Sequence, residues 1–413
     1  MLRLLTENTL DREEKIMAEW SEKSLGEIAE VTKLAGFEFT KYIEYNNDGE
    51  IIALRALNLR NGELDLTDIK RISREVSDGL TRSKIYKDDI LLTYTGNGYG
   101  DCAIIEENDK YHLAPNICKI VPNKEVVFPY YLYCYIRSKA FYNQMSNNMT
   151  GSGQPTIPMK TIRLLKIPVP EMRVQVNIAN MIWSLNQKIR NNKEINNNLE
   201  QQAQAIFSNE FLTLETLPDG WKQASLIDIA DYLNGLAMQK YRPTANETGI
   251  PVLKIKELRQ GCCDDNSELC SPNIKSEYII HDGDVIFSWS GSLLVDFWCG
   301  GICGLNQHLF KVTSNKHDKW FYYVWTKHHL DRFIAVAADK ATTMGHIKRD
   351  ELSKAEVLIP NKADYKRIGA LLQPIYDLII ANRIENKKLV ETRDTLLPKL
   401  MSGDIDISEV DYE

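Results

Sequence analysis

Residues 178–206 read IANMIWSLNQKIRNNKEINNNLEQQAQAI, and this stretch decides the architecture of the chain. Residues of the first series, Ile178 to Ile206, recur every seven positions, and a second series that begins at Ile182 interleaves with it. A seven-residue repeat is typical of a helix that packs along its length against another helix. The sequence therefore predicts a long helix whose partner lies elsewhere.

The same pattern returns at residues 368–396, IGALLQPIYDLIIANRIENKKLVETRDTL. Both copies carry asparagine within the seam, and asparagine there costs stability and is best explained as a device that sets register. In an antiparallel pair Asn192 can face Asn386, and Asn196 can face Asn382. Each helix of about 35 residues would extend roughly 50 Å. Two unrelated helices, each capping its own domain, are the alternative.

The regions before the two helices also resemble each other. IIALRALNLRNG at 51–62 matches IPVLKIKELRQG at 250–261, and GFEFTKY at 36–42 matches GLAMQKY at 235–241. TYTG at 93–96 has a counterpart, SWSG, in the second half. One duplication with small insertions explains these matches, and it gives two similar domains of about 150 residues, the usual domain size.

Each half contains short β-like runs bounded by turn residues, at 50–57 and 90–94 in the first and at 251–255 and 284–289 in the second. The aromatic segments that start at Phe128 and Trp320 are expected to be helices with one buried face, so that most of their rings lie in the core. The predicted fold class is α+β. Two mixed, β-rich domains alternate with two long helices that form an antiparallel coiled coil, in an internal pseudo-two-fold repeat.

Bulk properties are those of an ordinary globular protein. The 413 residues are 43% hydrophobic and 26% charged, and no apolar run approaches the roughly 20 residues needed to cross a bilayer. Acidic residues interrupt the start of the chain where a signal peptide needs an apolar stretch. We therefore expect a cytosolic, hence cytoplasmic, protein.

Eight cysteines in such a protein favour reduced thiols over a disulfide framework. Five of them lie between Cys262 and Cys303, but no CxxC pair recurs at zinc-ribbon spacing. Buried apolar thiols are the expectation, with no metal site.

The order of domain, long helix, similar domain and long helix, with IP or IPVP closing each domain and LLPKLMSGDI near the end, resembles the specificity subunit of type I restriction-modification systems. The resemblance covers residues 24–405. It implies that the globular parts are target recognition domains, each reading one half of a bipartite DNA sequence. It also implies that the helices are spacer regions that pair antiparallel and dock two methyltransferase subunits, which agrees with the pairing inferred from the asparagines.

The expected boundaries follow from the repeat and the resemblance together. They are an N-terminal helical segment at 1–20, recognition domain 1 at 21–170, spacer helix 1 at 171–212, recognition domain 2 at 213–361, spacer helix 2 at 362–405, and an acidic tail at 406–413. Whether residues 1–20 dock on a partner or cap the first domain stays open.

Matched positions in the two halves supply the candidate DNA-binding residues. A cation or small polar group present in both halves suits contact with phosphate or a base edge, although a solvated surface charge or a polar turn explains many of them equally well. The doubled loop would present small hydroxyls and a glycine at the end of a strand, where backbone can approach DNA closely. The candidates are Lys41, Tyr42, Arg55, Arg60, Thr93, Thr95, Gly96, Asn97, Lys119, Ser152 and Gln154 in the first half, and Lys240, Tyr241, Lys254, Arg259, Ser288, Ser290, Gly291, His308, Lys311, Thr343, His346 and Lys348 in the second.

Positions that differ inside matched frames are equally informative, because two different half-sites require different base-reading residues. Residues 97–100 differ from 292–295, and Asn116 differs from His308, so the target is expected to be asymmetric. His308 is alternatively a satisfied core histidine.

The net charge of −7 is unusual for a DNA-binding chain. Lysine plus arginine equals aspartate plus glutamate over residues 21–170 and falls slightly below it over 213–361. The isolated chain should therefore bind DNA modestly, with partner subunits supplying further phosphate contacts.

No phosphate-binding loop, HExxH, GxSxG or Asn-Pro-Pro-aromatic motif occurs, so we expect no catalysis and no cofactor on this chain. The resemblance implies adenine methyltransferase or endonuclease activity in partner subunits, with S-adenosylmethionine bound by the methyltransferase, and possibly restriction or translocase subunits. Two other readings remain: a coiled-coil scaffold without DNA contact, and a self-contained DNA-modifying enzyme.

Overall fold

The computed structural model describes residues 20–151, 155–339 and 349–407, and it divides the chain into two compact units. Unit 1 holds the described residues up to 187 together with those from 391 onward, and unit 2 holds residues 188–390. Each unit contains one globular part and a portion of both long helices. The expected N-terminal helix lies outside the described residues except for its last position, Trp20.

The globular part of unit 1 is built on two four-stranded sheets and a two-stranded ribbon. The first sheet is antiparallel throughout, whereas the second contains one parallel pair, β3 with β10. In spatial order the first sheet consists of β2 (Ala29–Lys33), β11 (Ile117–Pro122), β8 (Ile90–Thr93) and β9 (Cys102–Ile104). The second sheet consists of β6 (Lys70–Ile72), β3 (Ile51–Leu54), β10 (Tyr111–Leu113) and β7 (Lys84–Ile85), and the ribbon pairs β1 (Ser21–Ser24) with β12 (Lys166–Val169).

Unit 2 repeats the strand order of these three sheets, which confirms the internal repeat. Its parallel pair, β15 with β20, stands where β3 and β10 stand in unit 1. The strands are β14 (Asp231–Asn234), β21 (Leu309–Thr313), β18 (Val285–Ser288) and β19 (Leu294–Phe297); then β16 (Leu269–Cys270), β15 (Ile250–Leu253), β20 (Cys303–Leu305) and β17 (Ile279–Ile280); and the ribbon β13 (Lys222–Ser225) with β22 (Glu356–Ile359).

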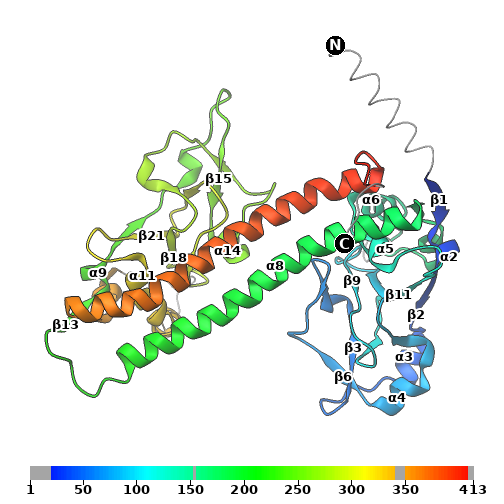
Figure 1. Ribbon diagram of the computed structural model, residues 1–413, viewed down its shortest axis with the longest axis horizontal. Helices are drawn as coiled ribbons and strands as arrows, with labels where there is room; N and C mark the ends of the chain where they lie inside the picture. Colours follow the sequence, from blue (N-terminus) through cyan, green and yellow to red (C-terminus); the bar gives the residue numbers. More distant parts are fainter. Residues whose placement is uncertain (1–19, 152–154, 340–348, 408–413) are drawn as a thin grey trace. The chain divides into compact units, whose positions relative to one another are not determined.

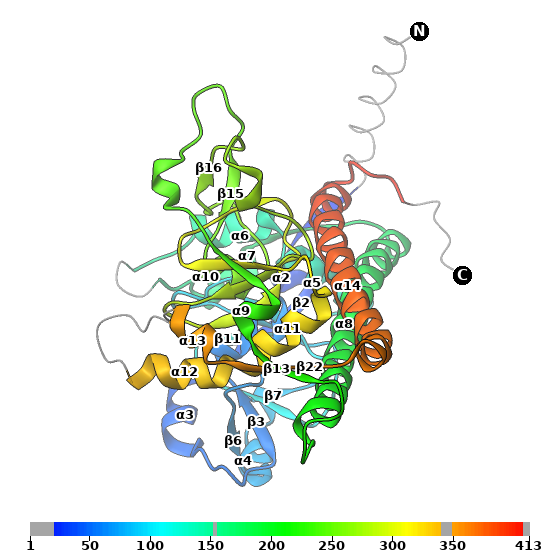
Figure 2. The same ribbon diagram turned by 90° about the vertical axis from the view of Figure 1, so that its left-hand side faces the viewer.

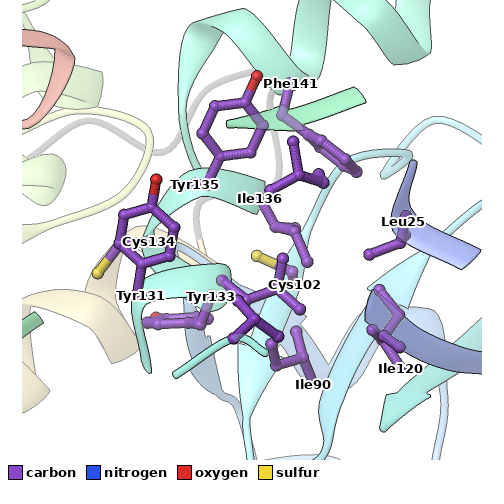
Figure 3. Packing of buried hydrophobic residues seen from close by; sticks show 14 of the residues in the cluster. Leu25, Ile90, Cys102, Ile120, Tyr131, Tyr133, Cys134, Tyr135, Ile136 and Phe141 are labelled. Carbon is purple, nitrogen blue, oxygen red and sulfur yellow. The ribbon is translucent and has the colours of Figure 1, made fainter. Parts of the chain in front are cut away.

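Each aromatic segment forms two helices, and most of its rings lie in the core, as expected. The expected single buried face is found in the second helix of each segment but not in the first. In α5 (Pro129–Ile136) every residue from Tyr131 to Ile136 is buried, and in α11 (Lys319–His328) the same holds from Trp320 to Thr326. Each is buried all round because sheet, neighbouring helix and long helix enclose it, as the packing around Tyr131, Tyr133 and Tyr135 shows (Figure 3). The helices α6 (Lys139–Asn147) and α12 (Leu330–Asp339) follow them.

Short helices complete the two globular parts. In unit 1 they are α2 (Leu25–Ile28), α3 (Gly36–Tyr42), α4 (Arg74–Gly79) and α7 (Met159–Leu164), with the small hairpin β4 (Leu59–Arg60) and β5 (Glu63–Leu64); in unit 2 they are α9 (Leu226–Ile229), α10 (Ile255–Gln260) and α13 (Arg349–Ser353).

One matched segment folds differently in the two units, around the matched positions Asn58 and Glu257. The buried Asn58 amide donates to the carbonyls of Asp65 and Asp68, both at 2.8 Å, and this draws the chain into the β4–β5 hairpin. Both side chains also accept from the backbone N–H three residues earlier, Asn58 from Arg55 at 3.0 Å and Glu257 from Lys254 at 3.2 Å. The Glu257 carboxylate has no N–H to donate, and the residues that follow it continue as α10. A change from amide to carboxylate therefore accompanies a change from hairpin to helix.

The long helices are α8 (Met172–Phe207) and α14 (Lys362–Ser402), and they lie side by side in both views (Figures 1 and 2). In unit 1, Ile178 and Ile182 of α8 share a core with Leu400 of α14. In unit 2, Ala203 of α8 shares a core with Ile368 of α14. Early residues of one helix thus meet late residues of the other in each unit, which confirms antiparallel packing and excludes two unrelated caps.

The predicted asparagine pairs form in unit 2. Asn192 Nδ2 donates to Asn386 Oδ1 at 2.9 Å, and Asn382 Nδ2 donates to Asn196 Oδ1 at 2.9 Å. Asn192 Nδ2 also donates to Glu385 Oε2 at 2.7 Å, so the amide nitrogen has two acceptors within a largely apolar seam. Their role in setting register stays a prediction.

Candidate nucleic-acid interface

The doubled loop follows β8 in unit 1 and β18 in unit 2, but its hydroxyls face the protein interior. Thr93 and Ser288 are both 0% exposed, and Thr95 and Ser290 are buried as well. The expectation that these hydroxyls are presented outward is therefore corrected. Of the loop residues, the glycines, with φ of +86° at Gly96 and +66° at Gly291, and the residues after them remain at least partly accessible.

Three of these four buried hydroxyls, those of Thr95, Ser288 and Ser290, hold the loop by hydrogen bonds, whereas Thr93 Oγ1 has no hydrogen-bond partner among the described residues. Thr95 Oγ1 shares a 2.5 Å hydrogen bond with Thr156 Oγ1, which ties the loop to the chain just before α7. Ser288 Oγ donates to the Ser292 carbonyl at 2.8 Å, and Ser290 Oγ shares a 3.1 Å hydrogen bond with His308 Nδ1. The half-buried His308 ring is thereby a partner of the doubled loop.

The matched lysines Lys119 and Lys311 lie inside their units, each beside a matched aspartate. Lys119 is 6% exposed, and its Nζ donates to the Lys84 carbonyl at 2.6 Å and lies 3.9 Å from Asp89. Lys311 Nζ donates to the Ile279 carbonyl at 3.0 Å and pairs with Asp284 at 2.8 Å. Both lysines therefore tie the two main sheets of their unit together, and in this arrangement they are not available to phosphate.

Burial dominates the electrostatics of the first of these pairs. It lowers the pKa of Lys119 and raises the pKa of Asp89, each against the opposing effect of its partner's charge. The presence of an aspartate at matched positions of both halves, Asp89 just before β8 and Asp284 just before β18, was the signal in the sequence that could have found the pairs.

The matched cations Arg55 and Lys254 also have acidic partners, but they lie nearer the surface. Arg55 Nη2 lies 3.0 Å from Asp68 Oδ1 and donates to the same residue's carbonyl at 2.8 Å. Lys254 Nζ lies 2.7 Å from Glu268 Oε1. Each acid precedes the edge strand, β6 or β16, of its sheet, so the ion pair itself is repeated.

The remaining matched cations are exposed. The acidic partner of Arg60 is distant, since its Nη1 lies 3.8 Å from Asp65 Oδ2, and Arg259 lies on the exposed face of α10. They are the matched arginines that the structure leaves most accessible.

Lys41 and Tyr42 end the helix α3, and their counterparts Lys240 and Tyr241 lie in and just after a 3₁₀ turn. All four are exposed, with Tyr42 at 45% and Tyr241 at 39%. Lys41 Nζ lies 5.0 Å from the centre of the Tyr42 ring, a cation–π distance. A cation beside an exposed ring is thus displayed in unit 1, at a place where unit 2 displays the same residue types.

Among the divergent positions, Asn97 is exposed, and Asn116 is exposed with φ of +74°. The candidates Ser152, Gln154, Thr343, His346 and Lys348 lie outside the described residues.

Sequence reasoning missed an aromatic pair close to the doubled loop of unit 1. Tyr99 and Tyr142 are 43 positions apart, and their rings stack at 5.2 Å with an 18° interplanar angle. Because no periodicity joins the two positions, the only signal in the sequence was the absence of charge around both.

All eight cysteines are free thiols, six of them buried and Cys262 and Cys263 half-buried. Burial raises the pKa of Cys102, Cys118 and Cys134 to about 12. Within the described ranges, no three His, Cys, Asp or Glu side chains gather as a metal site would require. No helix among those residues is long and apolar enough to span a membrane.

Comparison with known proteins gives a consistent match. The family model described as the type I restriction modification DNA specificity domain matches residues 17–201 and 218–391. The type I restriction enzyme MjaIX specificity subunit of Methanocaldococcus jannaschii is 25% identical, over 96% of each chain, and the HindI specificity subunit of Haemophilus influenzae is 21% identical, over 94% of this chain and all of that one. The crystal structure of the S subunit of a type I restriction-modification system from M. genitalium shares the fold, with a TM-score of 0.57 and 13% identity over 92% of this chain and 96% of that one.

Proposed function

The chain belongs to the type I restriction modification DNA specificity family, and from this premise we propose that each of its two globular parts reads one half of a bipartite, asymmetric DNA sequence. The observation that carries the proposal is the repeated strand order of the two units, combined with surfaces that differ. A repeated scaffold gives two recognition modules of one kind. Different exposed residues, such as Asn97 in one and Ser292 in the other, give them different targets.

The paired helices would set the spacing of the half-sites and dock two methyltransferase subunits. Antiparallel packing supports this part of the proposal, because a duplicated chain paired in this way offers two related helix surfaces. Reciprocal asparagine hydrogen bonds support a defined register between the helices, and hence a defined separation.

Catalysis is assigned to partner subunits. Adenine methylation with S-adenosylmethionine would take place in the methyltransferase subunits, and cleavage would require restriction or translocase subunits. The matched cations support a further role for the partners in binding phosphate, because Arg55 and Lys254 already face acids, Lys119 is buried, and the half-buried Lys311 pairs with Asp284. Much of the phosphate contact would then come from the partners.

The test compares methylated bases across the genome in cells with and without this gene. Loss of one split, asymmetric motif on deletion is the expected result. Methylation or cleavage by the purified chain alone would favour a self-contained enzyme. An unchanged methylome, together with no DNA binding by the complete complex, would favour a scaffold.

A further inference from the structure

Two segments of unit 1 lack charge entirely. Residues 91–100 and 140–159 contain no Asp, Glu, Lys, Arg or His, in a chain that is 26% charged. The second segment is not a buried one, because Tyr142, Asn143, Ser146 and Asn147 of α6 are exposed. An exposed surface of amides, hydroxyls and an aromatic ring is unusual for this chain and calls for a function.

The structure joins these two segments. The backbone N–H of Gly96 donates to the Pro155 carbonyl at 2.9 Å, and the N–H of Ile157 donates to the Tyr94 carbonyl at 3.0 Å. A β-bridge links Thr95 with Thr156. The exposed residues that the structure describes in the two charge-free stretches therefore lie next to each other beside the doubled loop and form one surface.

Tyr99 and Tyr142 form the aromatic centre of this surface. Tyr142 O–H donates to Tyr99 Oη at 2.6 Å, and the two rings stack. Gly100 has φ of +90°, and a Cβ there would come within 2.9 Å of the Tyr142 ring. The loop from Gly96 to Gly100 is thus shaped to admit the stack, and its own backbone bonds, such as Gly100 N–H to the Thr93 carbonyl at 2.9 Å, close it.

Among the described residues of unit 2, the positions that match Tyr99 and Tyr142 carry no tyrosine. In the matched frames Phe141 corresponds to Phe333, both 0% exposed, so Tyr142 corresponds to Ile334. When the two copies of the doubled loop are aligned, Tyr99 corresponds to Leu294, which is part of strand β19. Two aliphatic residues therefore stand where unit 1 has a hydrogen-bonded tyrosine pair.

We propose that Tyr99, held by Tyr142, is a specificity-determining residue of the first recognition domain and contacts a base edge in a DNA groove. The inference rests on the proposed function and deepens it. A surface without cations suits base edges rather than phosphates, because base edges are read by neutral donors and acceptors. Its small apolar content suits a groove better than the core of a protein interface, which is rich in buried apolar side chains.

The hydrogen bonds around the Tyr99 hydroxyl give the chemistry of the contact. This hydroxyl bonds with Tyr142 at 2.6 Å and also with the Ser146 side chain. If DNA takes the place of the Ser146 contact, Tyr99 can donate to N7 or O6 of guanine, N7 of adenine or O4 of thymine. Asn143 and Ser146, exposed on the same helix, offer further neutral donors and acceptors beside it. The stacked Tyr142 ring fixes the Tyr99 ring in place and is a positioning residue.

The test replaces tyrosine by phenylalanine in cells that carry the complete system, and it measures methylation of the motif and of its single-base variants. Tyr99→Phe is expected to raise methylation of variants at one position of one half of the motif by roughly 5- to 10-fold, the loss of a single hydrogen bond. Tyr142→Phe should relax the same position less. Tyr86→Phe, an exposed tyrosine of the same unit outside this surface, is the matched control and should leave the motif unchanged.

Thermal melting of the three variants, expected to match the wild type, excludes misfolding as the cause. If the Tyr99→Phe variant methylates the same motif as the wild type, with no relaxation at any position, this inference is overturned and the proposed function still stands. Relaxation that Tyr86→Phe reproduces would also overturn it. Absence of any methylated motif with the wild-type gene would overturn the proposed function, and this inference with it.

Discussion

The two globular parts share their interior and differ at their surface. Polar residues that recur in both, such as the lysines Lys119 and Lys311 and their aspartates, are buried or half-buried and hold sheets together. Residues that differ, such as Tyr99 against Leu294, lie beside the doubled loop. In this duplicated chain, a polar residue that occurs in both halves therefore often stabilises the fold. Residues that differ between the halves next to a repeated segment belong instead to the candidate DNA-reading surface.

The buried lysine pairs offer the largest test of this comparison. Lys119→Met should lower the free energy of unfolding by roughly 3 kcal/mol, because Asp89 then stays buried without its partner. Lys311→Met is the matched variant, and it should cost about half as much, since Lys311 and Asp284 are more exposed and a solvated charge tolerates the loss of its partner better. Chemical denaturation of each variant measures both values.

A second substitution separates charge from packing. Adding Asp89→Asn to Lys119→Met removes the unpaired charge and keeps an acceptor for the Tyr86 N–H, so part of the stability should return. If the single variants unfold like the wild type, the lysines are not structural ties.

The asparagine seam gives the next effect. Replacing Asn192 and Asn386 together by leucine should raise the melting temperature by roughly 2–4 °C, the shift expected for about 1 kcal/mol, because polar groups leave an apolar seam. The register of the helices should loosen at the same time, which cross-linking of engineered cysteine pairs can detect. An unchanged or lower melting temperature would argue against a register device.

The exposed matched arginines sharpen the contrast between interior and surface. Arg60→Ala and Arg259→Ala should each reduce the salt dependence of DNA binding by the complete complex, lowering the slope of log affinity against log salt by about 1. Lys311→Met should leave that slope unchanged, because its ammonium group already binds Asp284. Equal slopes for all three variants would contradict the assignment of accessible cations.

Acid sensitivity should differ slightly between the units. In unit 2 burial lowers the pKa of three histidines, His317, His328 and His329. Among the described residues of unit 1 it lowers the pKa of one histidine, His112. A histidine whose folded pKa is lowered contributes stability that is present above its ordinary pKa and is lost as pH falls through the folded value. Hydrogen exchange at pH 7 and pH 5.5 should show a larger loss of protection in unit 2. An equal loss in the two units would be evidence against this difference.

Much of the fold could be predicted from the sequence because its signals are periodic or repeated. The seven-residue pattern around Asn192 and Asn196 predicted both long helices and their antiparallel pairing, and self-similarity predicted the second domain. The aromatic helices were expected, but their complete burial depends on elements distant in sequence. The exchange of hairpin for helix after Arg55 and Lys254 was not expected, because it follows from hydrogen bonds of the Asn58 side chain to backbone seven and ten residues later, which no sequence pattern marks.

The candidate site was less predictable. A cation present in both halves suits phosphate contact and a buried ion pair equally well, and only the structure separates Lys119 from Arg60. The hydroxyls of the doubled loop raised the same ambiguity, and the fold turns them inward. The stack of Tyr99 on Tyr142 has no local pattern, since it forms only when the loop and α6 meet.

The central claim is that each globular part reads its own half of one split target. The measurement that tests it most directly replaces residues 21–170 by the corresponding domain of a relative with a different target and maps methylated bases in cells that carry the complete system. The account predicts a motif in which one half changes while the other half and the spacing stay the same. A motif changed in both halves, or in neither, would contradict it.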